Sequence, residues 1–520
     1  MTPVPKTPGV YIVEKSAFPN SVVEVATAVP AFVGYTQRHD VGGRSLKNRP
    51  WRITSMAEFQ DCFGHGPEPG YTLSTAKPVP DAGAPVSMDA PAFTAGGSPY
   101  YASRTSQRFH LYYSMLLFYR NGGGPCYVVS VGTHDTTPDA AGITAGIEAL
   151  ENEQEPTLLV TPDAVLLDAA SCASVQAAAL AHCGAIMRSR IAILDIHRGY
   201  LPRATPDPVT EFRNGAIGVE NLGFGAAYYP WLETIIAEAG SVGVRNLDAA
   251  GRSALKAILV DEGRTPVQLL ADLELADAAL AKGEQRDLQK DEQKDEQKDE
   301  QALDVLDRAL VACSLRYRAL MERLLADLNR LPPSGAIAGV YAMVDSTRGV
   351  WKAPANVGLG AVIKPAVNIS DAEQEDLNVS PDGKSVNAIR TFPGKGTLVW
   401  GARTLDGNSP ESRYVSVRRT LIMLEQSIRL ATRAYVFEAN DAGTWAAARS
   451  MIANFLTGIW KQGGLAGASP RDAFGVRVGL GETMTETDIE AGILRVAVLV
   501  AITRPAEFMA ISIEQRMQEA

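Results

Sequence analysis

The sequence predicts a multidomain fold that combines α/β and α+β modules. The chain has 520 residues and a mass of 55.5 kDa, which is too large for one ordinary domain. Strand-like and helix-like segments alternate over residues 109–200, as they do around a mainly parallel sheet. A separate strand and helix series begins at residue 387, beyond a purely helical region.

Composition excludes several functional classes. Apolar residues make up 46% and charged residues 21% of the chain, the proportions of a water-soluble globular protein. The formal net charge of -10 argues against a general nucleic-acid binder, which would present a basic surface. The five cysteines are odd in number and widely spaced, so we expect reduced thiols rather than a disulfide framework. The first residues hold no apolar signal segment, and the most apolar stretch, Ile493–Ile502, is about half the length of a membrane span. We therefore expect folding in the cytoplasm without direct membrane insertion.

The amino-terminal third divides into an arm and an insertion. Residues 7–14 and 22–35 are strand-like, so residues 1–35 are predicted to be a strand arm. Residues 36–108 are rich in Pro, Gly, Ser and Ala with weak periodicity, and we expect an irregular insertion around a little structure near residues 51–63.

Residues 109–245 are predicted to be the central α/β domain. Apolar spacing indicates a helix over Phe109–Arg120, and the glycines of Asn121–Gly124 end it, since glycine tolerates the left-handed conformation of a helix C-terminus. Strand Cys126–Val131 follows. The remaining elements expected in order are helix Ala141–Glu151, strand Thr157–Thr161, helix Ser171–Arg188 and strand Arg190–Ile196.

Residues 246–335 are predicted to hold two amphipathic helices packed as an antiparallel hairpin. Between the helices, Lys-Asp-Glu-Gln occurs in three tandem copies over residues 290–301. The period of four places like charges at i and i+4, and the segment has no apolar face to bury. We expect a solvated, mobile tip that exposes Lys290, Lys294 and Lys298, with a coiled-coil arm as the alternative.

The last predicted domain, residues 336–520, is a compact α+β module. Its series of strands and helices begins at Asn387–Leu405 and ends on a strand-like run from Arg504 to Ile513. Chain ends are usually frayed and polar. Ends that read as strands need a sheet to join, in their own subunit or in a neighbour. The elements expected between them are helices Val415–Tyr435 and Thr444–Gln462 and strands Ala473–Val478 and Arg495–Ile502.

Two glycine-containing motifs fall short of a catalytic pattern. Asp382–Ser385 is similar to the end of a phosphate-binding loop, but Asn378 stands where that loop needs a glycine. A polar turn is the better interpretation. Gly132–Asp135 is similar to the histidine segment of subtilisin-like proteases, but no Ser and Asp segments complete a triad.

The remaining polar clusters also fall short of a site. Cys172, His182 and Cys183 lack the paired spacing of metal ligands. Asp195 and His197 end a predicted parallel strand without further partners. We therefore expect no catalytic residue, no metal site and no cofactor.

One charge pattern indicates a partner surface. Between Arg403 and Arg433 the chain has six arginines, no lysine and three acidic residues. This excess within an acidic chain indicates either an anionic protein partner or ion pairs within the chain.

Eight segments together resemble a known family. In chain order they are Pro8–Glu14, Val25–Tyr35, Asn121–Val131, Asn387–Leu405, Tyr414–Arg419, Phe437–Asp441, Asn454–Leu456 and Arg504–Phe508. Their order resembles the sheath proteins of contractile tails, found in myophages, R-type pyocins and phage-tail-like contractile injection systems. The resemblance covers residues 1–35, a stretch near 109–200 and nearly all of 387–520, whereas residues 36–105 and 245–335 do not match.

The resemblance implies a structural subunit without enzymatic activity. Such subunits polymerise as stacked hexameric rings around an inner tube and contract to drive the tube through a target envelope. Residues 336–520 would be the polymerisation domain, completed by the amino-terminal strands, and the central domain would have a subtilisin-like topology without catalytic machinery. The two unmatched regions would be outer insertions.

The resemblance also implies how copies join. Terminal strands would enter sheets of neighbouring subunits by β-augmentation, in which main-chain hydrogen bonds supply affinity. Arg413, Arg418 and Arg419 would face an acidic inner tube. The strand-arm residues expected to take part are Val10, Tyr11, Ile12, Val13, Val23, Val25, Phe508, Ala510 and Ser512.

The expected partners are other copies of the chain, an inner tube protein, and baseplate and terminator or cap proteins. Sister sheath proteins and an AAA+ ATPase are further candidates, and nucleic acid is not a partner. Assembly would take place in the bacterial cytoplasm, with a phage tail or an injection particle as the final location. The alternative from a different class is a soluble α/β hydrolase or nucleotide-binding enzyme, which rests on Gly132–His134 and Asp382–Ser385.

Overall fold

The computed structural model describes residues 22–77, 91–283, 293–379 and 383–508. They group into two compact units, one of residues 27–418 and one of residues 419–508 with residues 22–26. The boundary falls inside helix α12 (Val415–Thr432).

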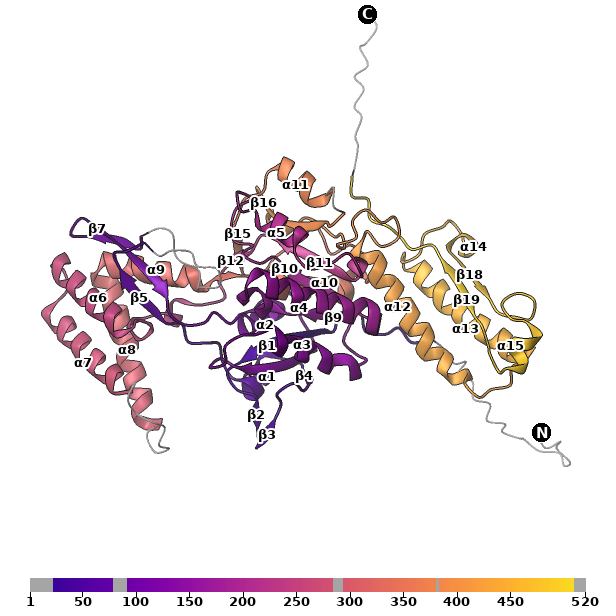
Figure 1. The fold of residues 1–520 in the computed structure, drawn as a ribbon, viewed down its shortest axis with the longest axis horizontal. Helices are drawn as coiled ribbons and strands as arrows, with labels where there is room; N and C mark the ends of the chain where they lie inside the picture. Colours follow the sequence, from indigo (N-terminus) through magenta and orange to yellow (C-terminus); the bar gives the residue numbers. More distant parts are fainter. Residues whose placement is uncertain (1–21, 78–90, 284–292, 380–382, 509–520) are drawn as a thin grey trace, which may run out of the picture. The chain divides into compact units, whose positions relative to one another are not determined.

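A nine-stranded sheet forms the centre of the larger unit (Figure 1). Six neighbouring strands of this sheet run parallel to one another, and antiparallel strands border them on both sides. This confirms the predicted α/β character of the centre. The strand order is β14 (Val357–Gly358), β17 (Gly396–Val399), β16 (Val386–Phe392), β11 (Gly225–Tyr229), β10 (Ile191–Asp195), β9 (Leu158–Val160), β1 (Pro30–Thr36), β8 (Cys126–Thr133) and β4 (Trp51–Ile53).

Helices cover both faces of this sheet. Alternate residues of β1 point to opposite faces, so Phe32 packs in one apolar cluster and Val33 in another. The Phe32 side is closed by α2 (Leu111–Arg120) and α10 (Ser334–Arg348), and the Val33 side by α3 (Ala140–Glu148) and α4 (Ala169–Ala181).

Helices α2 and α10 approach each other closely through two glycines of α10. A Cβ on Gly339 would lie 2.5 Å from the Phe118 carbonyl oxygen, and a Cβ on Gly335 would lie 2.8 Å from Ser114 Cα. Both contacts are shorter than real Cβ atoms make, so glycine at these two positions permits the close packing of the helices.

Within the described residues, one helical stretch is long and apolar enough to cross a membrane. Ala169–Met187 has a mean hydropathy of 1.3, and 50% of it is buried. Its Val175, Ala179 and Leu180 lie in the apolar cluster on the Val33 side of the central sheet. The stretch is therefore a core helix.

Strand β1 corrects one prediction. The extended run expected over residues 22–35 forms a strand only from Pro30, and that strand lies inside the central sheet between β8 and β9. Residues 30–36 are thus part of the central module rather than of a terminal arm, because all seven of their residues are buried. Residues 22–26 alone group with the carboxy-terminal residues.

The two insertions predicted from sequence meet in one helical region at the left of Figure 1. Strand β5 packs on α6, and α9 contacts β6 and β7. Residues 36–108 are therefore more regular than expected. The elements here are β5 (Tyr71–Ser74), β6 (Phe93–Ala95), β7 (Ser98–Arg104), α6 (Ala249–Glu262), α7 (Val267–Gly283), α8 (Gln293–Cys313) and α9 (Leu315–Leu328).

The helical hairpin also differs from its prediction. The expected second helix is two helices, since Ser314 ends α8 and caps α9 by accepting a hydrogen bond from the Tyr317 N–H at 3.0 Å. The repeat is helical from Gln293 onward, and the expectation of a solvated, mobile tip stays a prediction. Lys294 and Lys298 lie in this helix, and Lys290 lies outside the described residues.

The smaller unit is a short α+β module. Helix α13 (Ala442–Lys461) packs on an antiparallel pair, β18 (Phe474–Arg477) and β19 (Ala497–Val500). The predicted module was larger, but Val386–Phe392 and Gly396–Val399 extend the central sheet instead. The unit also contains α14 (Pro470–Ala473) and α15 (Glu486–Glu490).

The remaining elements of the larger unit are short. A second, three-stranded sheet has the order β13 (Arg330–Leu331), β12 (Leu232–Thr234) and β15 (Val362–Pro365). The others are β2 (Asp40–Val41), β3 (Arg44–Ser45), α1 (Met56–Phe63), α5 (Pro208–Asn214) and α11 (Asp371–Asn378).

Candidate assembly surfaces

The amino-terminal segment is fastened to helix α12 of the smaller unit. The Val25 N–H donates a hydrogen bond of 3.1 Å to Ser427 Oγ, and Ser427 is fully buried. Val23, two residues earlier, is 76% exposed. This contact joins the first described residues to α12. The predicted arm residues Val10, Tyr11, Ile12 and Val13 lie outside the described residues.

The small sheet of the same unit has a covered and an open face. In the register Gly475↔Leu499 and Arg477↔Ala497, directly opposed residues point to the same face. On this face Leu499 is 59% exposed, and Arg477 and Ala497 are exposed as well. A two-stranded sheet is marginal when isolated, and this one is supported by α13. In the described residues the sheet contains only β18 and β19, so their outer edges offer backbone groups for a further strand.

The carboxy-terminal run leaves this sheet as an extended tail. Residues 501–503 still bond to the unit, since the Ala501 N–H donates to the Ala473 carbonyl and the Thr503 N–H to the Gly464 carbonyl. Residues 504–508 form no strand, and Phe508 is 75% exposed. A terminal strand from Arg504 is therefore not formed up to Phe508. Ala510 and Ser512 lie outside the described residues, so the pairing of both arms stays a prediction.

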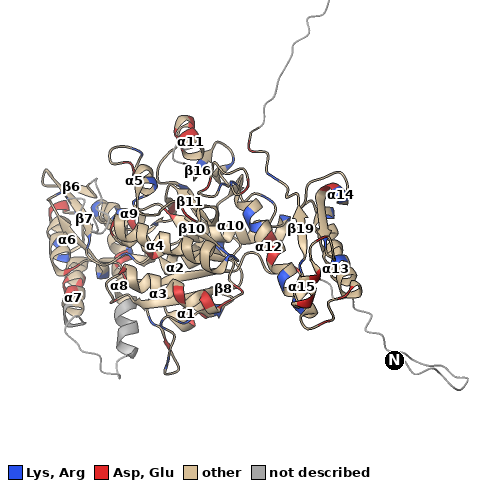
Figure 2. Ribbon diagram, turned by 45° about the vertical axis from the view of Figure 1, so that its right-hand side comes forward, with Lys and Arg blue, Asp and Glu red and all other residues tan. Residues whose placement is uncertain are grey.

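The arginines expected to face an inner tube make contacts within the chain. The Arg413 Nε donates to the Gly407 carbonyl at 2.9 Å, and the Arg418 guanidinium lies 4.6 Å from the centre of the Phe224 ring. Arg419 is only 4% exposed. Acidic and basic residues both occur along α12 (Figure 2). These two contacts are a bond to a carbonyl and a ring contact rather than ion pairs, so the ion pairs within the chain and the tube contact both stay predictions.

Lys384, in the motif similar to a phosphate-binding loop, bonds to the protein itself. It is buried, and its Nζ donates to the Arg213 carbonyl at 2.6 Å. Ser385 Oγ donates to the Asn378 carbonyl at 2.6 Å. Both side chains bond to backbone carbonyl groups of other segments, which is a structural role rather than a phosphate-binding one.

His134 packs as an aromatic ring. It stacks on Phe109 with ring centres 4.9 Å apart and an interplanar angle of 25°. Burial lowers the pKa of His134 to about 4, although Asp135 opposes the shift. Its Nε2 has no hydrogen-bond partner. A neutral ring packed in this way is not oriented as a general base.

Cys172, His182 and Cys183 are buried, and both cysteines lie in the apolar cluster on the Val33 side of the central sheet. Burial raises the pKa of both thiols to about 12, and burial and then Arg190 lower the pKa of His182 to about 4. His182 Nε2 lies 3.0 Å from Arg190 Nη1. Among the described residues no three His, Cys, Asp or Glu side chains gather as metal ligands.

The polar end of β10 also has a structural role. Asp195 accepts hydrogen bonds from the N–H and the hydroxyl of Ser334, the first residue of α10. Burial raises the pKa of Asp195 to about 7, although the Ser334 bonds oppose this. The carboxyl group thus fastens a helix to the sheet, while His197 contributes no further catalytic partner.

Sequence reasoning missed a buried ion cluster in the helical region. Asp327 of α9 lies 3.0 Å from Arg108 Nη2 and 3.5 Å from Arg104 Nη1 and accepts a bond from the Tyr71 hydroxyl. All three charged side chains are buried. The two arginines hold the pKa of Asp327 below its ordinary value against the opposing effect of burial. No local pattern could have joined residues 71, 104 and 327.

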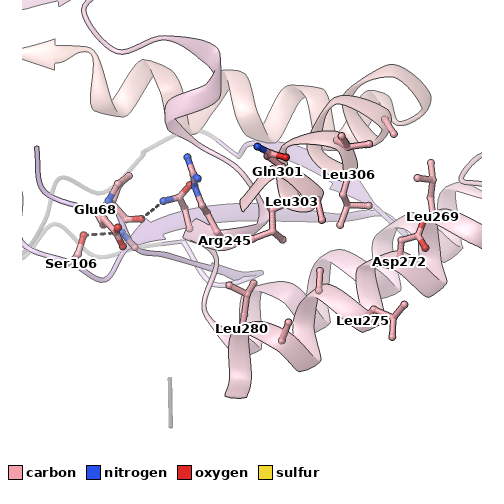
Figure 3. A pocket seen from close by; sticks show the side chains of 18 residues that line it. Glu68, Ser106, Arg245, Leu269, Asp272, Leu275, Leu280, Gln301, Leu303 and Leu306 are labelled. Carbon is pink, nitrogen blue, oxygen red and sulfur yellow. Dashed lines mark hydrogen bonds between the residues drawn. The ribbon is translucent and has the colours of Figure 1, made fainter. Parts of the chain in front are cut away.

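A hollow of about 1270 Å³ lies between α7 and α8 (Figure 3). Leucines of both helices line it, and Glu68, Arg245 and Asp272 supply charge. The leucine spacing of both helices was visible in the sequence, but not that the helices leave a gap. The hollow contains no arrangement of nucleophile and base.

The fold is similar to those of solved sheath structures. The chain matches the sheath of an extracellular contractile injection system, the PVC sheath complex in its contracted state, with a TM-score of 0.58 and 25% identity over 99% of both chains. It matches the helical sheath of the anti-feeding prophage in its contracted state with a TM-score of 0.58 and 26% identity, over 99% of this chain and 100% of that one. The resemblance to contractile sheath proteins is confirmed.

Sequence comparison also finds similarity to sheath proteins. Residues 408–516 match the family described as phage tail sheath C-terminal domain. The tail sheath proteins of Vibrio phage KVP40 and Enterobacteria phage T4 are 30% and 29% identical over 143 residues. The matched segment is 27% of this chain but only 21% of each of these sheath relatives, so the chain spans about a fifth of their length.

Proposed function

We propose that this chain is the structural subunit of a contractile sheath in a phage-tail-like injection system. The observation that carries the proposal is the similarity over 99% of the chain to sheath subunits of contracted particles. Copies would stack as hexameric rings around an inner tube and contract to drive the tube through a target envelope. The particle would be assembled in the bacterial cytoplasm, as a phage tail or an injection particle.

The terminal segments would join neighbouring copies by β-augmentation. Three features support this step: the Val25–Ser427 contact that joins the amino-terminal segment to α12, the extended tail up to Phe508, and the two-stranded sheet with open edges. A strand added to β18 or β19 would satisfy edge N–H and carbonyl groups with main-chain hydrogen bonds. These main-chain hydrogen bonds do not depend on the tilt of the rigid modules. The connection between copies can therefore persist while the subunits rearrange.

The central module would act as a rigid body without catalysis. We take its topology to be subtilisin-like, and the packed His134 and the buried Lys384 support a role without turnover. Contraction would exchange smaller interfaces for larger ones, and the free energy would be stored in the extended lattice rather than supplied by a nucleotide. The partners would be the inner tube, baseplate and terminator proteins, with sister sheath proteins and an AAA+ ATPase in addition.

Truncation tests the proposal. Chains that lack residues 1–21 or residues 509–520 should remain folded monomers with an unchanged unfolding midpoint, but should form no ordered tubes by negative-stain microscopy, whereas the full chain should form them. Residues 501–503 are kept because they bond to residues 464 and 473. As a matched control, replacement of residues 284–292 by a glycine-serine linker should leave tubes intact. Tubes formed by both truncated chains would show that strand exchange does not assemble the lattice.

The enzyme alternative has its own test. ATP or peptide-ester turnover by the purified chain that is lost in Lys384→Ala or His134→Ala would overturn the structural role. We expect no turnover above that of the buffer.

A further inference from the structure

One aromatic side chain of the smaller unit is completely exposed. Phe437 is 103% exposed and its neighbour Val436 is 58% exposed. Single exposed apolar residues are common, whereas adjacent ones that form a patch mark interaction sites.

The backbone holds Phe437 in a conformation that phenylalanine disfavours. The Tyr435 carbonyl accepts a hydrogen bond of 3.2 Å from the Glu438 N–H, which closes a four-residue turn. Val436 has φ -67° and ψ 128°, and Phe437 has φ 71°. These are the angles of a type II turn, whose third position favours glycine because φ is positive there. A bulky residue at this position is a genuine outlier.

The residues after the turn anchor it to the unit. Asn440 Nδ2 donates to the Ile493 carbonyl at 3.1 Å, and Trp445 Nε1 donates to Asn440 Oδ1 at 2.7 Å. Asp441 caps α13 by accepting from the Thr444 N–H at 2.9 Å. Ile493, which lies against this anchor, is itself 40% exposed. The turn therefore presents Phe437 from a fixed base.

The distribution of exposed apolar residues indicates which surface Phe437 meets. The smaller unit holds 95 of the described residues, yet it carries eight of the eighteen large hydrophobic side chains exposed among them. Exposed apolar side chains are thus more frequent in the smaller unit than in the larger one. These eight are Val23, Leu430, Val436, Phe437, Leu480, Ile493, Leu499 and Phe508.

We propose that the Tyr435–Glu438 turn inserts Phe437 into the apolar surface of the smaller unit of a second copy of this chain, where it anchors the subunit interface. This inference rests on the proposed function, because a sheath brings copies of this unit together. It adds a side-chain anchor to the main-chain strand exchange, and a single aromatic anchor often dominates the affinity of an interface.

The substitution Phe437→Gly separates an interface role from a structural one. Glycine accepts a positive φ, so the monomer of this variant should unfold at the same urea concentration as the wild type or a higher one. If Phe437 is an anchor, the same variant should assemble poorly. Its critical concentration for tube formation, measured by sedimentation, should rise at least about tenfold. The matched control is Val219→Ala, because Val219 is 80% exposed in the larger unit, and its critical concentration should stay within about twofold of the wild type.

The outcomes separate this inference from the proposed function. If wild-type tubes form and Phe437→Gly assembles at the wild-type critical concentration, the anchor is wrong and the sheath role stands. If the wild-type chain forms no tubes, the sheath role itself fails and the anchor fails with it. A monomer of Phe437→Gly that unfolds well below the wild type would assign the side chain to folding and also overturn the anchor.

Discussion

At the scale of single residues, the buried charged groups hold distant segments together. Asp327 forms ion pairs with two buried arginines, and Asp163 accepts bonds from the Tyr35, His110 and Leu111 N–H groups. Asp163 thereby joins β1 to the start of α2, and burial raises its pKa to about 6 despite these bonds. Sequence reasoning dismissed the catalytic motifs, and the contacts of Lys384 and His134 agree with that. It could not find Asp163 or Asp327, because their partners are distant in sequence.

Removal of the Asp327 carboxylate should strongly destabilise the monomer. Asp327→Ala leaves the guanidinium groups of Arg104 and Arg108 buried without their counter-charge, and we expect a loss of about 3–5 kcal/mol in the free energy of unfolding. Urea denaturation measures this. The control is Asp261→Ala, whose carboxylate pairs with Arg316 at the surface and should contribute less than about 1 kcal/mol. Equal effects of the two substitutions would rule out a special role for the cluster.

His134 should make the monomer sensitive to acid. Its folded pKa of about 4 lies below the ordinary value of 6.5, so its contribution to stability is complete above pH 6.5 and is lost as pH falls toward 4. In His134→Phe the stack on Phe109 is retained and no proton is taken up. As the pH falls from 7 to 4.5, the urea midpoint of the wild type should therefore decrease more than that of the variant. A difference between the two midpoints that does not change with pH would contradict this.

At the scale of elements, local patterns predicted helices well and their interruptions poorly. The expected Phe109–Arg120 and Thr444–Gln462 helices correspond to α2 and α13 within two residues at each end. The break at Ser314 was missed because the leucine stripe continues across it and the stripe says nothing about a cap. The charged repeat was expected to be a mobile tip, and its residues from Gln293 onward belong to α8, since helix continues outward from the packed part of α8.

The charged repeat should be dispensable for assembly. Among the described residues, the first leucine of α8 that lines the hollow between α7 and α8 is Leu303, which follows the repeat. A short glycine-serine linker in place of residues 284–301 should leave tube formation unchanged and shift the unfolding midpoint only slightly. Microscopy and urea denaturation of the same preparation check both. Loss of the tubes with an intact monomer would show that the arm joins subunits.

At the scale of the whole molecule, the sequence predicted the types of module better than it predicted which strands belong to each module. The alternation of strands and helices indicated the central sheet, but nothing local placed β1 between β8 and β9 or joined β16 to β11. One signal was present, because residues 30–36 are almost wholly apolar and such runs are typical of strands buried on both faces. Pairing between distant segments depends on the complete sheet, and the resemblance to sheath proteins could not supply it for each strand.

The central claim is that the terminal segments of one copy pair with the β18–β19 sheet of another, and photo-cross-linking tests it most directly. The chain would carry p-benzoylphenylalanine in place of Tyr11, and equal amounts of isotopically heavy and light subunits would be mixed before assembly. Mass spectrometry should then find heavy–light cross-links between residue 11 and residues 474–477 or 497–500. Cross-links found only within single chains, or only to other elements, would contradict the claim.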